Sequence, residues 1–326
     1  MRRRDKMRIL VTGATGFIGS YIVKELSERG ENIVVFDIQP PPVSMAKFTE
    51  NATWIQGDIR NENEVEKVVS ENRPEVIINM AGLLLFGCME NPRRAVEVNV
   101  LGLSNVLEAS RKHGVRRIVT ASSAAVYGTA KSDPREVAPI PTNVTLYGAT
   151  KFLNEILCRQ YIENYELEAT NLRYYGVYGP GEVRSPGMAK VIKSIESIVT
   201  GRNVVLPNLK ASDHTHLVFV ADAAHATVLA ATVPGPLSIA YNIAGTPEDY
   251  VSFREIVSTI KKLEPASGDV IFEGKGEARG LGMFDISLAR KELGFNPRYT
   301  MEEGLKESIN YFKQANLDKR QRSGVL

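Results

Sequence analysis

The chain has 326 residues, which is enough for one large α/β unit or for two coupled domains, and we expect two. Its 40 basic and 38 acidic residues are well mixed and leave a net charge of +2, so no global field favours nucleic acid or an anionic membrane as a partner. A small-molecule substrate is the better expectation. The two cysteines lack the Cys/His spacing of a zinc site, so no metal is expected.

The basic amino terminus is not expected to be a signal peptide, because the apolar stretch that follows it is soon interrupted by a glycine-rich turn. No segment approaches the ~18 apolar residues of a membrane span. These features predict a soluble, cytoplasmic protein.

Short β-branched segments alternate with helical patterns through the first half of the chain. Strands are expected at 9–11, 33–36, 53–56, 76–79, 117–121 and 169–173, and helices at 17–29, 61–71, 93–113 and 147–164. This alternation predicts an α/β fold with a doubly wound parallel sheet of the Rossmann type, in which ligands bind beyond the carboxyl ends of the strands.

The regularity weakens after Arg173. Helices are expected at about 187–200, 222–231, 252–263 and 301–314, a strand at 240–244, and a frayed polar tail at 315–326. We therefore expect a nucleotide-binding domain over 1–173, with contributions from about 217–246, and a smaller lobe over 174–326 that mainly binds the substrate.

A glycine-rich turn joins the first strand to the first helix. It reads Gly-Ala-Thr-Gly-Phe-Ile-Gly over residues 13–19. Backbone amides and the positive end of the helix can hold a pyrophosphate there. The residues expected at the cofactor are Gly13, Gly16, Phe17, Ile18 and Gly19.

Asp37 stands at the tip of the second strand, 18 residues after Gly19, where a carboxylate can accept hydrogen bonds from the adenosine ribose and repel a ribose phosphate. No Arg or Lys follows among residues 38–43, so NAD is favoured over NADP. The alternative is that Asp37 only caps a turn.

Two later strand ends also point to the cofactor. Asp58 follows the third strand and is placed to reach the adenine amino group, while Ala81 and Gly82 follow the fourth and are small enough for a close approach of the backbone. Taken singly, each of these segments is also consistent with an ordinary junction between a strand and a loop.

Tyr147 and Lys151 are four residues apart, so a helix places them on one face, where the ammonium can stabilise a phenolate for acid/base work. Ser123 ends the strand that precedes this helix and can stand opposite Tyr147. Taken alone, the Tyr/Lys pair is better explained as a solvated helix face, because this spacing is common by chance; the glycine turn and the serine strand favour the catalytic reading.

At these residues the chain resembles the extended short-chain dehydrogenase/reductase family of NAD-dependent epimerases and dehydratases. The resemblance covers nearly the whole chain and includes the glycine turn, Asp37, Asp58-Ile59, residues 79–82, Asn99, SSAAVYG at 122–128, YGATK at 147–151, LRYYGVYGP at 172–180, Asp222 and residues 284–297.

The resemblance implies a role for each matched residue. Tyr147 would be the general base for a secondary hydroxyl, Lys151 would lower the phenol pKa and hold the nicotinamide ribose, and Ser123 would bind the reacting oxygen. Ile59 would line the cofactor site, Tyr174 would lie near the nicotinamide, and Asn99 would brace the fold around Lys151.

Several positions depart from the family pattern. Ala124 and Ala125 stand where dehydratases and decarboxylases carry an acidic residue, which leaves reversible oxidation as the reaction. Gly176 replaces a diphosphate-binding Asn, and residues 215–217 and 206–208 replace an Arg-Asp-Phe segment and a glycine-rich segment. These changes suggest a weaker diphosphate grip. The apolar run 83–86 is read either as a pocket wall or as core.

His214, His216 and His225 are close in sequence, and we favour surface or packing roles for them over contact with an anionic substrate. Arg184 and Arg279 are candidate anion contacts in the second lobe.

Three functions follow from these patterns. The first is an NAD-dependent oxidoreductase that takes hydride from a secondary hydroxyl of a sugar, sugar acid or similar compound. The alternative is a UDP-sugar 4-epimerase that acts through a transient ketone, and the third is a non-catalytic NAD sensor, which the Tyr/Lys pair disfavours. The resemblance also implies a homodimer through the helices near 93–113 and 147–164.

Overall fold

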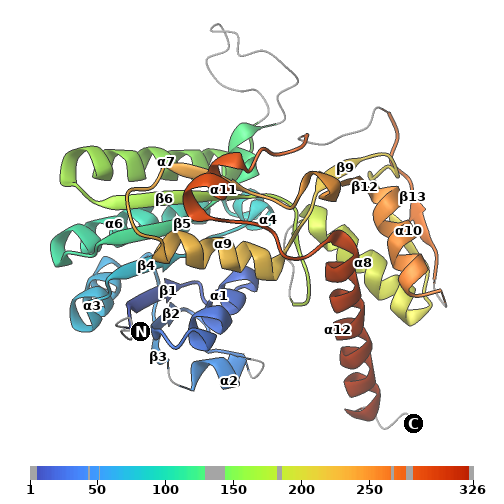
Figure 1. Ribbon diagram of the computed structural model, residues 1–326, viewed down its shortest axis with the longest axis horizontal. Coiled ribbons are helices and arrows are strands. Elements are labelled where there is room, and N and C mark those ends of the chain that lie inside the picture. The colour runs from blue at the N-terminus through green and yellow to red at the C-terminus, as the bar shows by residue number, and fades with distance from the viewer. Residues whose placement is uncertain are drawn as a thin grey trace, which may run out of the picture. The chain divides into compact units, whose positions relative to one another are not determined.

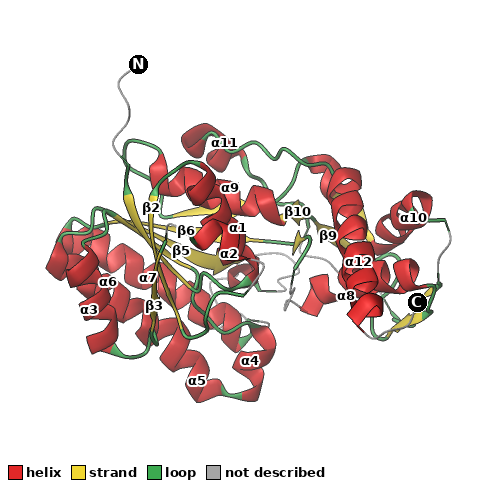
Figure 2. Ribbon diagram, turned by 90° about the horizontal axis from the view of Figure 1, so that it is seen from below, coloured by secondary structure: helices red, strands yellow, loops and turns green. Residues whose placement is uncertain are grey.

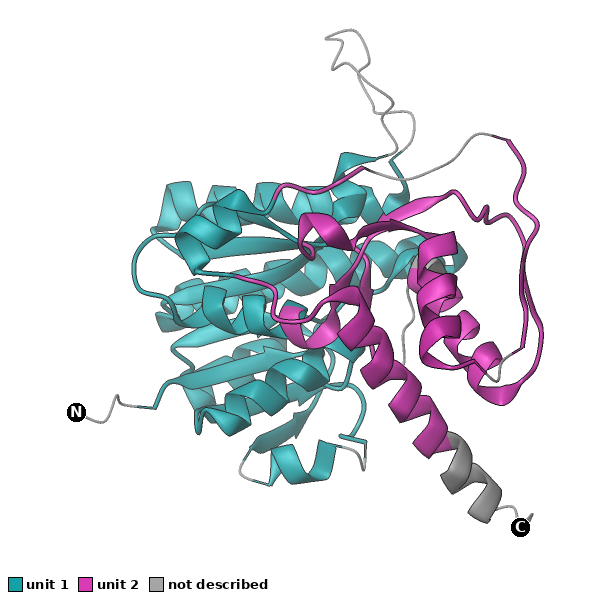
Figure 3. Cartoon of the chain, turned by 45° about the vertical axis from the view of Figure 1, so that its right-hand side comes forward, with its two compact units in different colours: residues 1–174, 223–243, 286–295 teal, residues 175–222, 244–285, 296–326 magenta. Residues whose placement is uncertain are grey.

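The computed structural model describes residues 6–42, 45–50, 52–128, 144–181, 186–265, 268–276 and 282–322. Two compact units divide the chain (Figure 3). Unit 1 contains residues 1–174, 223–243 and 286–295, and unit 2 contains residues 175–222, 244–285 and 296–326. From the sequence we expected the main domain boundary after Arg173. That expectation did not include residues 286–295 in the first unit.

Unit 1 is built on a seven-stranded parallel sheet with the order β11-β6-β5-β4-β1-β2-β3 (Figure 1). Its strands are β1 (Arg8–Thr12), β2 (Asn32–Asp37), β3 (Thr53–Gln56), β4 (Val76–Asn79), β5 (Arg117–Ser123), β6 (Glu168–Tyr174) and β11 (Ala240–Ile243). The strand order reverses between β1 and β4, which is where open α/β sheets bind their ligands. The predicted doubly wound sheet is thus confirmed.

Helices cover both faces of this sheet (Figure 2). One face carries α1 (Phe17–Glu28), the unit 1 part of α9 (Val220–Thr232) and α11 (Ser287–Leu293), and the other carries α3 (Glu62–Asn72), α6 (Gly102–His113) and α7 (Leu146–Tyr165). Buried side chains of the strands and of α3 and α6, such as Ile77, Ile118, Val69 and Leu107, form a core between them. Burial on both faces explains the continuous apolar strands.

The helix expected over 93–113 is interrupted. The structure has α4 (Leu85–Glu90), α5 (Pro92–Val96), a π-helical turn η2 (Glu97–Leu101) and then α6. The 3.6-residue pattern of apolar positions does not reveal a π turn, because only one residue is added to the helix. Short helix α2 (Ala46–Thr49) was also not expected.

In its described residues, unit 2 combines short strand pairs with three longer helices. The strands are β7 (Val177–Tyr178), β8 (Val204–Leu206), β9 (His214–His216), β10 (Val218–Phe219), β12 (Tyr250–Ser252) and β13 (Val270–Phe272), and the helices are α8 (Pro186–Thr200), α10 (Phe253–Leu263) and α12 (Met301–Arg322). Strands of two or three residues are too short to show an alternating pattern. The tail expected to fray after Gln314 instead continues α12 to Arg322.

Within the described ranges, no helix has both the length and the apolar character needed to cross a lipid bilayer.

Candidate active site

The glycine turn follows β1 and opens α1. Gly13 has a φ of +63°, and a Cβ there would lie 2.5 Å from the backbone nitrogen of Ala81 after β4. A Cβ on Gly19 would lie 2.3 Å from the Gly13 carbonyl oxygen. Both positions therefore require glycine, since the turn packs directly on backbone.

Gly16, by contrast, is exposed and caps the amino end of α1. Phe17 and Ile18 begin the helix, and their N–H groups belong to the first turn, which has no intrahelical acceptors. An exposed glycine beside such amides fits the pyrophosphate of a dinucleotide.

Asp37 is buried at the end of β2, and its carboxylate holds the turn together. Its Oδ2 accepts from the Thr15 N–H at 3.0 Å and from Thr15 Oγ1 at 2.9 Å, while Oδ1 accepts from the Gln39 N–H at 3.1 Å. These bonds are what the turn-capping alternative requires, and Oδ1, which accepts only one of them, still has capacity to accept a ribose hydroxyl. The two roles are therefore compatible at this position.

We expect Asp37→Ala to weaken NAD binding about tenfold, because a hydrogen bond to a charged acceptor is lost. NADP binding should weaken less, since the variant also removes repulsion of the ribose phosphate. Asp37→Asn, which retains an acceptor for Thr15, separates turn capping from ribose binding. Titration of each variant with both cofactors checks the prediction, and equal losses for NAD and NADP would contradict it.

Asp58 and Ile59 follow β3 and differ in their surroundings. Hydrogen bonds and charge from Arg60 lower the pKa of Asp58, whose Oδ2 lies 2.6 Å from Arg60 Nη2. Ile59 is buried in the core, where a Cβ on Gly102 would come within 2.8 Å of its side chain. The Ile59 side chain thus packs in the core. The partly exposed Asp58 is the better candidate for a polar contact with adenine.

Asn99 joins the loop after β4 to helix α7. Its Oδ1 accepts from the Leu83 N–H at 2.7 Å, and its Nδ2 donates to the Leu83 carbonyl at 3.0 Å and to Thr150 Oγ1 at 3.1 Å. A Cβ on Gly82 would lie 3.3 Å from Asn99 Oδ1 and 3.4 Å from Lys151 Nζ. Gly82, Asn99 and Lys151 therefore meet at one point, and the π turn presents the Asn99 side chain to it.

Lys151 and Tyr147 lie one turn apart at the start of α7. Lys151 is buried, donates from Nζ to the Ala121 carbonyl at 2.7 Å, and has Nζ 5.8 Å from the centroid of the Tyr147 ring. The Tyr147 side chain hydrogen-bonds with Ser123 at the end of β5. The structure thus brings the three predicted catalytic residues together.

Burial controls both ionisations. It raises the pKa of Tyr147 to about 12, an effect that the hydrogen bond with Ser123 partly offsets, and it lowers the pKa of Lys151 to about 8. Without other charges at the site, the phenol is therefore protonated at neutral pH. That Lys151 lowers the phenol pKa during the reaction stays a prediction.

Gly148 fixes the approach of α7 to the serine loop. A Cβ there would lie 2.3 Å from the carbonyl oxygen of Ala125 in the short helical turn η3 (Ala124–Tyr127). Ser123 Oγ accepts from the Ala125 N–H at 3.2 Å, so the same turn also holds the serine. The sequence motifs did not single out Gly148, although a glycine inside a helix lowers helix stability and was a usable signal.

Tyr174 ends β6 directly beside Ser123 in the sheet register. Its buried hydroxyl hydrogen-bonds to Thr227 Oγ1 at 2.6 Å and lies 3.9 Å from Met80 Sδ, next to the loop that contains Ala81. Burial raises the pKa of this tyrosine, so it stays neutral. Its side chain therefore lies next to Ser123 and is held there by burial and by the hydrogen bond to Thr227.

The profile of the NAD-dependent epimerase/dehydratase family matches residues 9–244. The chain belongs to this family. It is 30% identical over 312 residues to a putative UDP-glucose 4-epimerase of Methanocaldococcus jannaschii, with 94% of this chain and 99% of the relative covered.

Two solved structures of UDP-glucose 4-epimerases agree with the fold of this family member. The Thermotoga maritima enzyme with UDP-glucose has a TM-score of 0.83 at 28% identity, covering 95% of this chain and 100% of that one. The Thermus thermophilus enzyme in complex with NAD has a TM-score of 0.81 at 27% identity, with the same coverage. The chain is therefore an NAD-dependent enzyme of the extended short-chain dehydrogenase type, as the sequence predicted, with NAD as its cofactor.

The structure bears on several positions where this chain departs from the family pattern. Gly176 has a φ of +63°, and a Cβ there would lie 2.1 Å from the His216 carbonyl oxygen, so no Asn fits without movement. Leu84 directly precedes α4 and Phe86 lies within it, and both are exposed, so the run 83–86 is not ordinary core. Arg184 and Arg279 lie outside the described residues.

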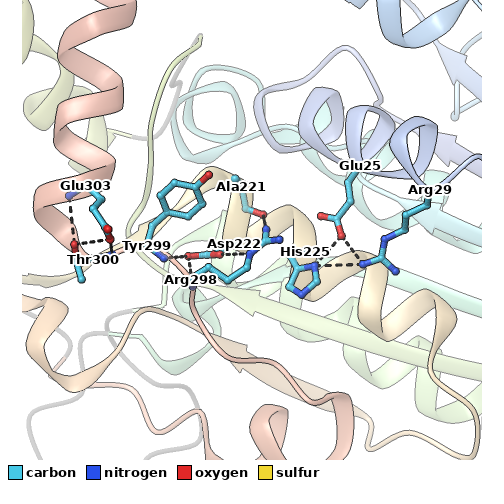
Figure 4. A network of polar contacts seen from close by, with 9 residues as sticks. All are labelled: Glu25, Arg29, Ala221, Asp222, His225, Arg298, Tyr299, Thr300 and Glu303. Atoms are coloured by element: carbon cyan, nitrogen blue, oxygen red, sulfur yellow. Dashed lines mark hydrogen bonds and ion pairs between the residues drawn. The ribbon is translucent and has the colours of Figure 1, made fainter.

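The histidines singled out in the sequence are held by hydrogen bonds or by ring contacts within the protein. His225 Nδ1 lies 2.7 Å from Glu25 Oε1, which also pairs with Arg29 (Figure 4). His216 Nε2 donates to the Thr246 carbonyl at 2.7 Å and its Nδ1 accepts from the Phe284 N–H at 3.0 Å. Burial lowers the pKa of His216, in keeping with a neutral ring.

His214 stacks on Tyr250, with ring centroids 5.3 Å apart. Asp222, at the start of α9, is fully buried and accepts from the backbone N–H groups of Arg298 and Tyr299, both at 3.0 Å (Figure 4). In the part of the chain that the structure describes, no cluster of three or more His, Cys, Asp or Glu side chains is suited to a metal.

Proposed function

We propose that the protein is a UDP-sugar 4-epimerase that retains NAD through the catalytic cycle. The observation that carries the proposal is the grouping of Ser123, Tyr147 and Lys151 at the carboxyl ends of β4, β5 and β6, with alanines at 124 and 125. Those alanines offer no carboxylate for elimination or decarboxylation. Relatives matched along almost their whole length are named UDP-glucose 4-epimerases, which favours this reading over a net dehydrogenase.

In this proposal, Tyr147 exchanges one proton with the sugar. Its phenolate takes the proton of the 4-hydroxyl as hydride leaves C4, and the phenol returns the proton when hydride is restored to the opposite face. When bound, NAD supplies reversible hydride acceptance. Ser123 donates a hydrogen bond to the reacting oxygen, and the Lys151 ammonium stabilises the phenolate.

The proposed cofactor contacts follow from the same residues. Gly16 and the first turn of α1 would hold the pyrophosphate, Asp37 the adenosine ribose, and Asp58 the adenine. Lys151, with Asn99 fixing the loop beside it, would hold the nicotinamide ribose. Tyr174 would border the nicotinamide.

The test is to incubate the purified protein with UDP-glucose, UDP-glucuronate and UDP-N-acetylglucosamine, together with free sugars and sugar acids as controls. Proton NMR should show formation of the 4-epimer of one UDP-sugar while absorbance at 340 nm stays flat. Stoichiometric accumulation of NADH with an alcohol would overturn the epimerase in favour of the net dehydrogenase. NAD released by acid from the untreated protein measures cofactor retention.

We further propose a homodimer formed through α4, α5, η2 and α7. These elements pack together in unit 1 and expose an unusual number of large apolar side chains, namely Phe86, Met89, Val96, Leu101, Phe152, Leu153 and Ile156. Exposed apolar side chains on neighbouring elements are a typical sign of a protein interface. The same elements of a second copy would cover it.

Light scattering should give a mass of twice the 36.0 kDa chain at micromolar concentration. Phe152→Glu places a charge in the patch and should yield the monomer, because an unpaired charge is costly to bury. Leu288→Glu on α11 is the matched control, since Leu288 is 40% exposed and lies outside the patch. A monomeric mass for the wild-type protein would contradict the proposed dimer.

A further inference from the structure

An ion pair with a buried carboxylate is bonded to Ser122, the residue that precedes the proposed catalytic Ser123. Glu155 of α7 is only 4% exposed, and its Oε1 accepts from Arg173 Nε at 2.8 Å while Oε2 accepts from Arg173 Nη2 at 2.5 Å. Oε1 also accepts from Ser122 Oγ at 2.6 Å. The two-pronged geometry is the strong form of an arginine–carboxylate contact.

The pair belongs to a row of polar residues across three strands. Ser122 of β5 is in register with Arg173 of β6, and Arg173 is in register with Asn242 of β11. We call these three residues the polar row. The next row toward the carboxyl edge begins with Ser123 and Tyr174.

Tyr127 closes the polar row at its exposed end. Its hydroxyl accepts from Arg173 Nη1 at 2.6 Å and donates to Asn242 Oδ1 at 2.8 Å. Tyr127 is the last residue of η3, the turn that begins directly after Ser123. The serine is thus flanked by two anchored residues, Ser122 before it and Tyr127 after it.

We propose that Glu155, Arg173 and the Tyr127 hydroxyl are positioning residues, which hold Ser123 at the place where it hydrogen-bonds with Tyr147. They touch neither substrate nor cofactor in this scheme, and they act through the two ends of the serine loop. The kinetic part of the inference rests on the proposed function, whereas the structural part concerns the Ser123–Tyr147 hydrogen bond itself. A site held this way by supporting bonds loses rate when the supports are removed, since small displacements of a reacting group are costly.

The decisive variant is Tyr127→Phe, which removes one hydroxyl from a side chain that is 42% exposed and leaves the ring in place. Tyr165→Phe is the matched control, because Tyr165 is 52% exposed at the far end of α7. Arg173→Lys is a second variant, which retains the charge but cannot form the fork to Glu155. Equal melting temperatures for the two tyrosine variants establish that both fold.

The first readout needs no substrate. In protein labelled with ¹³Cζ-tyrosine, the Tyr147 resonance is assigned by its absence from Tyr147→Phe, and Ser123→Ala gives its position without the serine hydrogen bond. In Tyr127→Phe and Arg173→Lys we expect this resonance to move toward the Ser123→Ala position, while Tyr165→Phe leaves it unchanged. A resonance that stays at its wild-type position in both variants overturns the proposal.

The second readout is the separate effect of the variant on kcat and on KM in steady-state kinetics. We expect kcat of Tyr127→Phe to fall about tenfold with KM and NAD content unchanged, which is the signature of a lost alignment rather than of lost binding. A fall in kcat without movement of the resonance also overturns the proposal, because the loss then has another origin. If the wild-type protein epimerises no UDP-sugar, the proposed function fails and the resonance alone decides the positioning role.

Discussion

Tyr147→Phe is expected to lose about 10³-fold in turnover while it purifies with as much NAD as the wild type. The variant removes the only phenolic oxygen of the side chain that hydrogen-bonds with Ser123, and it leaves the ring that lies 5.8 Å from Lys151 Nζ. Proton transfer therefore fails while the cofactor surface on α1 is untouched. Turnover by NMR and acid-released NAD by mass spectrometry measure the two properties separately.

The comparison with Lys151→Met sharpens this prediction. Lys151 Nζ is held by the Ala121 carbonyl and stands beside Gly82 and Asn99, so its removal should lower both turnover and NAD retention. A Tyr147→Phe protein with substantial activity would show that another group takes the proton. A Tyr147→Phe protein without NAD would instead show that the phenolic hydroxyl itself helps to bind the cofactor.

Gly148→Ala is expected to cost about 10²-fold in turnover, although the substitution adds only one methyl group. The new Cβ would lie 2.3 Å from the Ala125 carbonyl oxygen and 3.0 Å from its carbon, and backbone cannot move aside as a flexible side chain does. Helix α7 and η3 must separate, which pulls Tyr147 away from Ser123. Steady-state kinetics should show the loss in kcat, with NAD content preserved.

Gly87→Ala in α4 is the control for Gly148→Ala. It makes the same change in another helix, where the nearest atom would be Leu83 Cδ2 at an ordinary 3.5 Å. We expect this variant to retain wild-type turnover. Equal activity of the two glycine variants would mean that the separation of α7 from η3 does not govern the reaction.

The sequence predicted the sheet, the main helices of unit 1 and the shared helix face of Tyr147 and Lys151 because each depends on local signals, and it placed Ser123 opposite them because Ser123 ends the preceding strand. Buried parallel strands are continuously apolar, and the i, i+4 spacing fixes Tyr147 and Lys151 to one helix face. Family membership and the NAD cofactor were predicted from the order of such motifs, and the comparisons confirm both.

What the sequence did not predict depends on contacts between distant residues. The bonds of Asp37 to Thr15 and the meeting of Glu155, Arg173 and Ser122 require the register of β1, β2, β5 and β6. From the sequence, Gly176 was interpreted as the loss of a substrate contact. In the structure, its positive φ and its close approach to the His216 backbone also require glycine. The two- and three-residue strands of unit 2 leave no periodic pattern to detect.

The π-helical turn at Glu97–Leu101 also bears on which sequence changes this region can absorb. The turn contains one residue more than the same length of α-helix, so deleting one residue there would give a straighter and intrinsically sound helix. The deletion would nevertheless rotate everything on one side of it by about 100° relative to the other. Either Asn99 would leave Leu83 and Thr150, or Leu103, Val106 and Leu107 would leave the core. Length, rather than residue identity alone, is therefore constrained in this segment.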